Sequence, residues 1–273
     1  MTKLTYDVDG PLAILTLNRP DKLNAIDNDI VEQINAALDR AEADEQVRAI
    51  VINGNGRAFS AGFDLDTGEE GSGRDVVALR NMLRRDFDVI MRFWYSPKPT
   101  LAAVHGYCLG SGMEMALACD LTIASEDARF GAPEVQFGSG IITMIIPWLV
   151  GAKFAKELLL VGDDHVPAER ALAIGLINKV VPAGKALEAT LDMARDVATN
   201  ARLAVSMTKQ AINRSYDIMG MRQAMEQALE LDVIVEAADT PESRAFYDRV
   251  AKEGARAAIA WRRERILNSG HKD

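Results

Sequence analysis

Two glutamates stand in turns whose glycines and proline would hold their carboxyl groups in fixed positions. Glu114 comes two residues after Gly112, the last glycine of the run 106–112, and Glu134 directly follows Gly131-Ala132-Pro133. A carboxyl group held in a defined place can accept and deliver protons during a reaction. The two turns therefore predict acid/base chemistry at Glu114 and Glu134 rather than ordinary surface charge.

A place for a substrate carbonyl oxygen is predicted beside Glu114. The apolar strand 101–104 precedes glycines that open a helix, and the first N–H groups of a helix have no partner within it. Residues 57–65 follow another apolar strand and also end in a turn of small residues. Two backbone donors that converge on one oxygen form an oxyanion hole, which stabilises the enolate of a thioester. Glu114 lies one turn after Ser111, and apolar neighbours such as Met113 would raise its pKa.

Other interpretations of these segments are weaker. Glu114 alone could be a carboxylate stabilised by the helix dipole, and Glu134 alone a surface residue near a helix cap. A serine hydrolase needs Gly-x-Ser-x-Gly, which the run around Ser111 lacks, so His105 is expected to be a hydrogen-bonded turn residue. The same glycines match neither the dinucleotide fingerprint nor a Walker motif. The pair of glutamates favours catalysis.

Composition narrows the class of protein further. The 273 residues carry a net charge of −9, which argues against a nucleic-acid partner. The first residues lack the apolar core of a signal peptide, and the longest apolar stretch, 141–150, is interrupted by Thr143 and Pro147, so no membrane segment is expected. Cys108 and Cys119 lie in an apolar, glycine-rich region, which predicts two buried thiols, no metal site and a cytoplasmic protein.

Hydrophobic periodicity predicts an α/β protein up to about residue 198. An opening β-hairpin is expected over 4–8 and 12–17, followed by a helix from an N-cap at Asp27 to about Ala43. Three further strands are expected, separated by helices. They are 49–53, 101–104 and 121–124, with helices over about 74–95 and 112–118. Alternation of strands and helices is typical of parallel sheets covered by helices.

After Pro182 the sequence predicts only helices, over 183–198, 202–216, 222–238 and 241–261. We therefore predict a core domain with the active site at 1–198 and a helical oligomerisation domain at 199–273. The apolar stripe of that tail favours core packing, with part of it facing a neighbouring subunit. The basic aromatic run 261–265 is expected to be a solvated helix face or a subunit contact rather than a clamp for a phosphate group of a ligand.

Four motifs resemble the crotonase family, the enoyl-CoA hydratase/isomerase superfamily, in order and approximate spacing. They are 18–25, 59–64, 106–120 and 130–134. The resemblance runs over essentially the whole chain and implies a spiral of ββα turns followed by a helical C-terminal trimerisation domain. It also implies a homotrimer or a dimer of trimers, an acyl-CoA thioester as substrate, and no cofactor beyond the coenzyme A of the substrate.

The resemblance assigns roles to individual residues. The oxyanion hole would be the backbone N–H groups of Phe63 and Ser111. Hydration of a 2-enoyl-CoA is implied, with Glu114 acting mainly on water and Glu134 mainly on the α-proton. The backbone-lined coenzyme A groove would comprise Lys22, Leu23, Ala25, Ala61, Asp64, Leu65 and Gly110.

One segment departs from the family pattern. After Glu134 the hydratases usually continue with a proline and a glycine-rich helix start, whereas residues 135–151 here are shorter and more apolar. This change is expected to bring Ile141, Ile142, Met144 and Trp148 near the water site. A drier site favours one alternative, a double-bond isomerase, in which a glutamate shuttles a proton between two carbons. A separate, non-enzyme alternative is an inactive crotonase-like binding or scaffold protein, and the retention of both glutamates argues against it.

Overall fold

The computed structural model describes residues 2–64, 75–238 and 240–269. Within them, a six-stranded sheet has the order β1-β2-β3-β5-β7-β10, and a smaller four-stranded sheet has the order β4-β6-β8-β9. The larger sheet comprises β1 (Leu4–Asp9), β2 (Leu12–Leu17), β3 (Ala49–Gly54), β5 (Thr100–Val104), β7 (Leu121–Ser125) and β10 (Lys179–Val181). The smaller comprises β4 (Ala58–Ser60), β6 (Tyr107–Leu109), β8 (Arg129–Gly131) and β9 (Val166–Pro167).

The two sheets are built by a repeated strand–strand–helix unit. β3, β5 and β7 pair in parallel in the large sheet, and β4, β6 and β8, which follow them in the chain, pair in parallel in the small one. A helix follows each pair of strands: α2 (Val76–Tyr95), α3 (Ser111–Ala118) and α4 (Glu134–Phe137). Consecutive units therefore stack, and α2 packs against α3.

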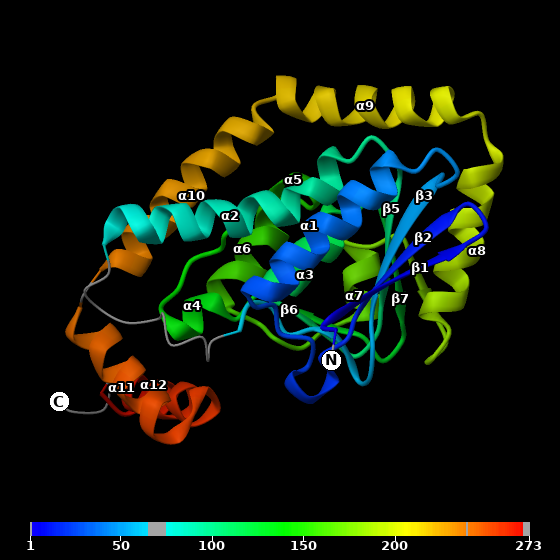
Figure 1. Cartoon of the computed structure of the whole chain (residues 1–273). Helices are drawn as coiled ribbons and strands as arrows, with labels where there is room; N and C mark the ends of the chain where they lie inside the picture. Colours follow the sequence, from blue (N-terminus) through cyan, green and yellow to red (C-terminus); the bar gives the residue numbers. More distant parts are fainter. Residues whose placement is uncertain (1, 65–74, 239, 270–273) are drawn as a thin grey trace.

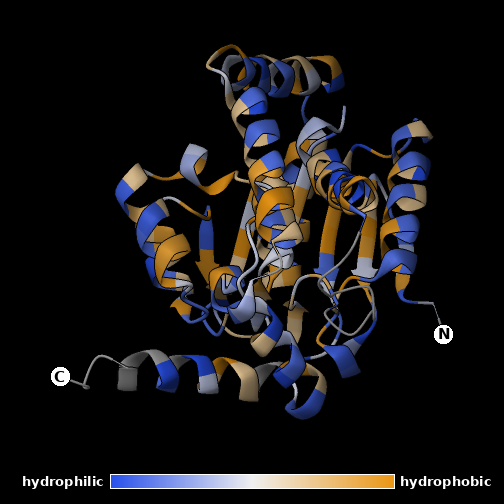
Figure 2. Cartoon of the chain, turned by 90° about the vertical axis from the view of Figure 1, so that its left-hand side faces the viewer, coloured by the Kyte–Doolittle hydropathy of each residue, from blue (hydrophilic) through white to orange (hydrophobic). Residues whose placement is uncertain are grey.

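Both faces of the large sheet are covered. Alternate residues of β3 face opposite ways, so that Ile50 and Ile52 join the larger apolar cluster with α1 (Asn28–Ala43) and α2. Ala49 and Val51 join the smaller cluster with α8 (Ala186–Thr199). Figure 2 shows the strands as mostly hydrophobic between helices of mixed hydropathy. This double burial explains why the strands are short continuous apolar runs.

Most of the expected elements are confirmed. The opening hairpin pairs Leu4 with Leu17, and the Asp27 side chain caps α1 by accepting a hydrogen bond from the N–H of Ile30. Both cysteines are free and buried. The expected helix over 241–261 is wrong, because Gly254, with φ of +85°, separates α11 (Pro241–Glu253) from α12 (Ala255–Ser269). Glycine adopts this backbone conformation without the steric cost that other residues bear.

The helices after residue 200 pack on the core through polar anchors. In α9 (Arg202–Ile218), the Lys209 ammonium lies 2.8 Å from the Asp120 carboxylate and also donates to main-chain carbonyls before β5. Asn213 donates to the carbonyl of Trp94 at 2.8 Å. α10 (Met221–Ala237) lies along α2 (Figure 1). None of the helices in the described ranges is long and apolar enough to cross a membrane.

Four short helices complete the described part of the chain. They are α5 (Ile146–Leu149), α6 (Ala152–Val161), α7 (Ala168–Ala173) and the 3-10 turn η1 (Pro20–Lys22). α5 lies within the segment whose sequence departs from the family pattern and α6 follows it, and both contribute side chains to the larger apolar cluster. That segment is therefore integrated into the core.

Candidate active site

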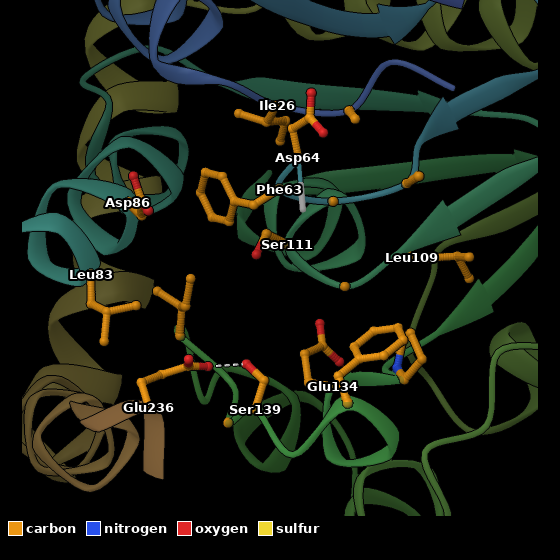
Figure 3. Close-up of a pocket in the computed structure, with 18 of the residues that line it drawn as sticks. Ile26, Phe63, Asp64, Leu83, Asp86, Leu109, Ser111, Glu134, Ser139 and Glu236 are labelled. Atoms are coloured by element: carbon orange, nitrogen blue, oxygen red, sulfur yellow. Dashed lines mark hydrogen bonds between the residues drawn. The ribbon is translucent and has the colours of Figure 1, made fainter. Parts of the chain in front are cut away.

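Three chain segments meet at one cavity of about 430 Å³. They are the turn after β4 with Ala61 and Phe63, the start of α3 with Gly110 and Ser111, and the start of α4 with Glu134. Figure 3 shows Phe63 and Ser111 on one side of Glu134, with Leu83 of α2 across the cavity. The stacked strand–strand–helix units thus bring together residues that are far apart in the sequence.

Glycines allow these segments to approach closely. A β-carbon on Gly62 would lie 3.2 Å from the backbone nitrogen of Ser111, and one on Gly110 would lie 2.6 Å from Oε1 of Glu134. Gly110 has φ of +53° and ψ of −133°, a backbone conformation open almost only to glycine. The turn after β4, the start of α3 and the Glu134 carboxyl group are therefore in direct contact.

The backbone N–H groups of Phe63 and Ser111 are left unused by the hydrogen bonds among the described residues. The N–H of Ile26 donates to the carbonyl of Gly62, and the N–H of Asp64 donates to the carbonyl of Ile26. In this parallel bridge the N–H of Phe63 points away from Ile26. Ser111 is the first residue of α3, whose N-cap Gly110 offers no side-chain acceptor, so its N–H has no intrahelical partner. The geometry suits two donors on one oxygen.

The two glutamates occupy different environments. Glu134 lines the cavity, and burial raises its pKa to about 8, with the nearby Asp232 charge acting in the same direction. Glu114 is only 1% exposed and does not line the cavity. Its Oε1 accepts the N–H of Thr143 at 2.7 Å. Burial, and then the charge of Glu134, raise the pKa of Glu114 well above its ordinary value. Two adjacent carboxyl groups of this kind retain a proton near neutral pH.

Most residues of the expected coenzyme A groove lie at the cavity. Lys22, Ala25, Ala61, Asp64 and Gly110 line it. Leu23 does not line it in the described structure, but its carbonyl accepts the N–H of Ala61 at 3.0 Å and so supports the turn. Asp64 pairs with Arg19 at 2.6 Å. Leu65 lies outside the described residues.

The divergent segment contributes less apolar surface to the cavity than expected. Of the four residues named for it, Ile142 lines the cavity, whereas Ile141, Met144 and Trp148 pack in or against the main core. Ser139 and Gly140 also line the cavity. The segment therefore supplies two apolar wall residues, Phe137 and Ile142, a polar part of the wall and the backbone donor that orients Glu114.

Sequence reasoning missed the wall formed by α2 and α10. Asp86, Asp232 and Glu236 line the cavity opposite the glycine-rich turns. The sequence did hold an indication that these two acids face inward. Asp232 and Glu236 fall three and seven residues after Leu229, on the side of α10 that carries its buried residues. Distance along the chain hid their connection to Glu134, since only the packing of α10 on α2 brings them to the site.

Two further expectations concern surface residues. The expected hydrogen bond of His105 is confirmed: its Nε2 lies 2.9 Å from the carbonyl of Gly56. In the basic aromatic run, the Arg262 guanidinium donates to the carbonyl of Gln136 at 2.7 Å and lies 4.3 Å above the ring of Phe246. Burial lowers the pKa of Arg262. Arg262 thus holds α12 against α4, next to the cavity.

The chain matches the family model described as enoyl-CoA hydratase/isomerase over residues 8–250. It belongs to that family and is an enzyme with the crotonase fold, which confirms the resemblance seen in the motifs. An enoyl-CoA hydratase/isomerase structure from Xanthobacter autotrophicus Py2 is similar with a TM-score of 0.92 and 48% identity, covering 96% of this chain and 98% of the other.

Proteins with similar sequences have names of the same kind. A protein named putative enoyl-CoA hydratase from Thermus thermophilus is 37% identical over 88% of this chain and 96% of its own length. The short-chain-enoyl-CoA hydratase of Clostridium acetobutylicum is 35% identical over 85% of this chain and 87% of its own length.

Proposed function

We propose that this enzyme adds water to the double bond of a 2-enoyl-CoA and forms a 3-hydroxyacyl-CoA. The observation that carries the proposal is the placement of the Glu134 carboxyl group against Gly110, beside the backbone N–H of Ser111, which has no partner among the described residues. An acid next to an oxyanion hole can deliver a proton to the α-carbon of the enolate held there. Family membership supports the same class of reaction.

In the proposed mechanism, the N–H groups of Phe63 and Ser111 polarise the thioester carbonyl and make the β-carbon electrophilic. Glu114 removes a proton from water, whose oxygen bonds to the β-carbon, and the electrons of the double bond move onto the carbonyl oxygen. Glu134 then delivers its proton to the α-carbon as the carbonyl re-forms. Burial raises the pKa of both carboxyl groups, so the pair holds a proton near neutral pH, and the forward reaction requires that Glu134 carries it.

The coenzyme A part of the substrate is proposed to lie along Lys22, Ala25, Ala61 and Asp64, close to Leu23 and Leu65, and to require no further cofactor. These residues follow the family pattern, and four of them line the cavity. The two free, buried cysteines support the proposal of a cytoplasmic enzyme, because a reducing compartment preserves such thiols.

Isomerisation of the double bond is the second candidate. It is favoured by one observation, that Glu134 lines the cavity while Glu114 does not. A single carboxyl group can take a proton from one carbon of the acyl chain and return it to another without water. The two reactions are separated by the mass of the product.

The proposal is tested by mixing the purified enzyme with crotonyl-CoA and following the ultraviolet absorbance of the conjugated thioester. Hydration removes this absorbance and adds the mass of one water to the product. If crotonyl-CoA binds but gains no water, hydration is excluded. Conversion of a 3-enoyl-CoA into the conjugated 2-enoyl-CoA would then establish the isomerase.

The rate of hydration is expected to fall at alkaline pH. Glu134 must carry a proton, and its pKa is raised to about 8, so kcat/KM for hydration should decline about tenfold per pH unit above about 8. The measurement is an initial-rate profile from pH 6 to 10. Residual activity of Glu134→Gln should lack this decline, because glutamine does not titrate. A wild-type profile that stays flat to pH 10 would contradict the role of Glu134 as proton donor.

We also propose that the chain forms a homotrimer or a dimer of trimers through the region 199–273. Large apolar side chains on α9 and α10 are exposed in the single chain, among them Leu203, Ile218 and Leu231 at 72%, 86% and 64%. Such surface usually marks a contact between proteins. Light scattering should give three or six times the chain mass of 29.8 kDa, and a monomer at micromolar concentration would contradict the proposal.

A further inference from the structure

The two glutamates of the proposed mechanism share the proton that the pair retains near neutral pH. Glu114 is 1% exposed, whereas Glu134 lines the cavity. Burial disfavours the charged form of a carboxyl group, so burial alone would leave the shared proton on Glu114. The proposed hydration needs the opposite arrangement, with Glu114 ionised as the base and Glu134 protonated as the acid. The mechanism therefore requires groups that stabilise the carboxylate form of Glu114.

Thr143 of the divergent segment provides such groups. Its N–H donates to Oε1 of Glu114 at 2.7 Å. Thr143 is 0% exposed, and its hydroxyl oxygen has no hydrogen-bond partner among the described residues. Oε2 of Glu114 is also buried and also lacks a partner there. An unpaired buried donor and an unpaired buried acceptor both cost free energy. The two residues, already joined by one hydrogen bond, therefore favour a second one when Glu114 is ionised.

Ser111 provides a further hydroxyl group. It is the first residue of α3, and Glu114 lies three residues later, so the two side chains are neighbours on the helix surface. Ser111 is 6% exposed. The hydroxyl groups of Thr143 and Ser111 both lower the pKa of Glu114, against burial and the charge of Glu134, which raise it. The N–H of Thr143 acts in the same direction as the hydroxyl groups. Three donors from two segments thus act on one carboxyl group.

Glu134 has a different environment. Its Oε2 has no hydrogen-bond partner in the part of the chain that the structure describes. Its own N–H lowers its pKa, whereas the charge of Asp232 on α10 raises it. Both differences favour a proton on Glu134 rather than on Glu114. Further charged side chains near α3 form ion pairs. They are Asp86 with Arg85 on α2, and Asp120 with Lys209 beyond the end of α3.

We infer that Thr143, together with Ser111, is a positioning residue that holds Glu114 ionised and leaves the shared proton on Glu134. The inference rests on the proposed function and deepens it, because it assigns a role to side chains other than the two glutamates. Hydrogen bonds to a carboxylate are stronger than those to a neutral group, so the hydroxyl groups favour the ionised form. The divergent segment, whose composition suggests a drier site, thereby supplies a donor that suits the site to hydration.

Thr143→Val tests the hydroxyl group alone, because it keeps the size of the side chain and the N–H that bonds to Glu114. Loss of a hydrogen bond to a charged group should raise the pKa of Glu114 by about one unit. The acidic limb of the kcat/KM profile for hydration should move to higher pH by the same amount, because the base must be ionised. We expect kcat to fall about tenfold near neutral pH and binding of a saturated acyl-CoA to change by less than about threefold.

Thr143→Ser keeps the hydroxyl group and should restore both the rate and the acidic limb. Ser111→Ala keeps the backbone N–H and should shift the limb in the same direction as Thr143→Val. Thr190→Val is the matched control, since Thr190 is also 0% exposed but its hydroxyl donates to the carbonyl of Ala186 within α8. This control should leave kcat and the pH profile unchanged.

Infrared spectroscopy measures the same protonation without turnover. The C=O band of a protonated carboxyl group is separated from the bands of a carboxylate, and the band that Glu114→Gln removes belongs to Glu114. Near neutral pH, Glu114 should be a carboxylate in the wild type, and its titration should move to higher pH in Thr143→Val. A protonated Glu114 in the wild type, or an unchanged titration in Thr143→Val, would overturn the inference. Failure of hydration leaves this titration measurable, so the inference and the proposed reaction fail separately.

Discussion

Glu134→Gln should lower kcat for hydration by a factor of about 10² to 10⁴, the usual contribution of a positioned acid or base. Glutamine keeps the size of the side chain that packs against Gly110 but cannot deliver the proton to the α-carbon. Binding of a saturated acyl-CoA should change by no more than a few fold, because the carboxyl group acts on the reacting carbons. The measurement pairs steady-state kinetics on crotonyl-CoA with calorimetry.

Glu114→Gln should cause a loss of the same scale, and the double variant should be hardly worse than the poorer single one, because residues that act as a unit are not additive. Glu188→Gln, at an exposed position on α8, is the control and should retain full rate. A rate within threefold of the wild type in either active-site variant would remove that residue from the mechanism.

Glu134→Gln should not destabilise the enzyme. Because the pKa of Glu134 rises from 4.5 to about 8 on folding, its contribution to stability is full below pH about 4.5 and is lost as the pH rises through about 8. Glutamine removes this loss. We expect the melting temperature of ligand-free Glu134→Gln at pH 9 to equal or exceed that of the wild type, as is common where a site is arranged for function.

Gly110→Ala should reduce activity by about 10²-fold, the lower end of the loss expected for the glutamate substitutions. Its β-carbon would lie 2.6 Å from Oε1 of Glu134, so the carboxyl group must move away from the proposed oxyanion hole. A displacement of about 1 Å can cost about 10²-fold in rate. The backbone, with φ of +53°, would also resist alanine at a cost of about 1–3 kcal/mol. Kinetics and thermal unfolding of the same protein measure both effects.

Gly10→Ala separates the two effects. Gly10 has nearly the same φ, +54°, in the turn between β1 and β2, and a β-carbon there meets nothing within 4 Å. This control should lose stability through the backbone and keep its kcat. If Gly110→Ala were as active as Gly10→Ala, contact between Gly110 and Glu134 would have no bearing on catalysis.

Much of the fold could be predicted from local sequence patterns. Hydrophobic periodicity predicts the hairpin, the short apolar strands and α1 with its cap at Asp27. Apolar residues recur every second position in a strand and every three to four positions in a helix, so the sequence of one element is enough to predict it. The break at Gly254 was missed because an isolated glycine inside a helical pattern can either be tolerated or end the helix. The divergent segment was also judged from composition alone. Only its packing shows that three of the four apolar residues expected near the water site, Ile141, Met144 and Trp148, lie in or against the core instead.

By itself, the sequence was enough to predict the family, the two candidate glutamates and the glycine-rich turns. The turns can be predicted because positive φ angles and close approach of backbones require glycine. The tertiary structure alone decided that Glu114 lies behind the cavity wall while Glu134 faces it. It also decided that Asp232, 98 residues after Glu134, completes the same cavity. The physical reason is that contacts between distant segments depend on how helices pack, and the packing of α10 on α2 is set by shape and burial rather than by any local motif.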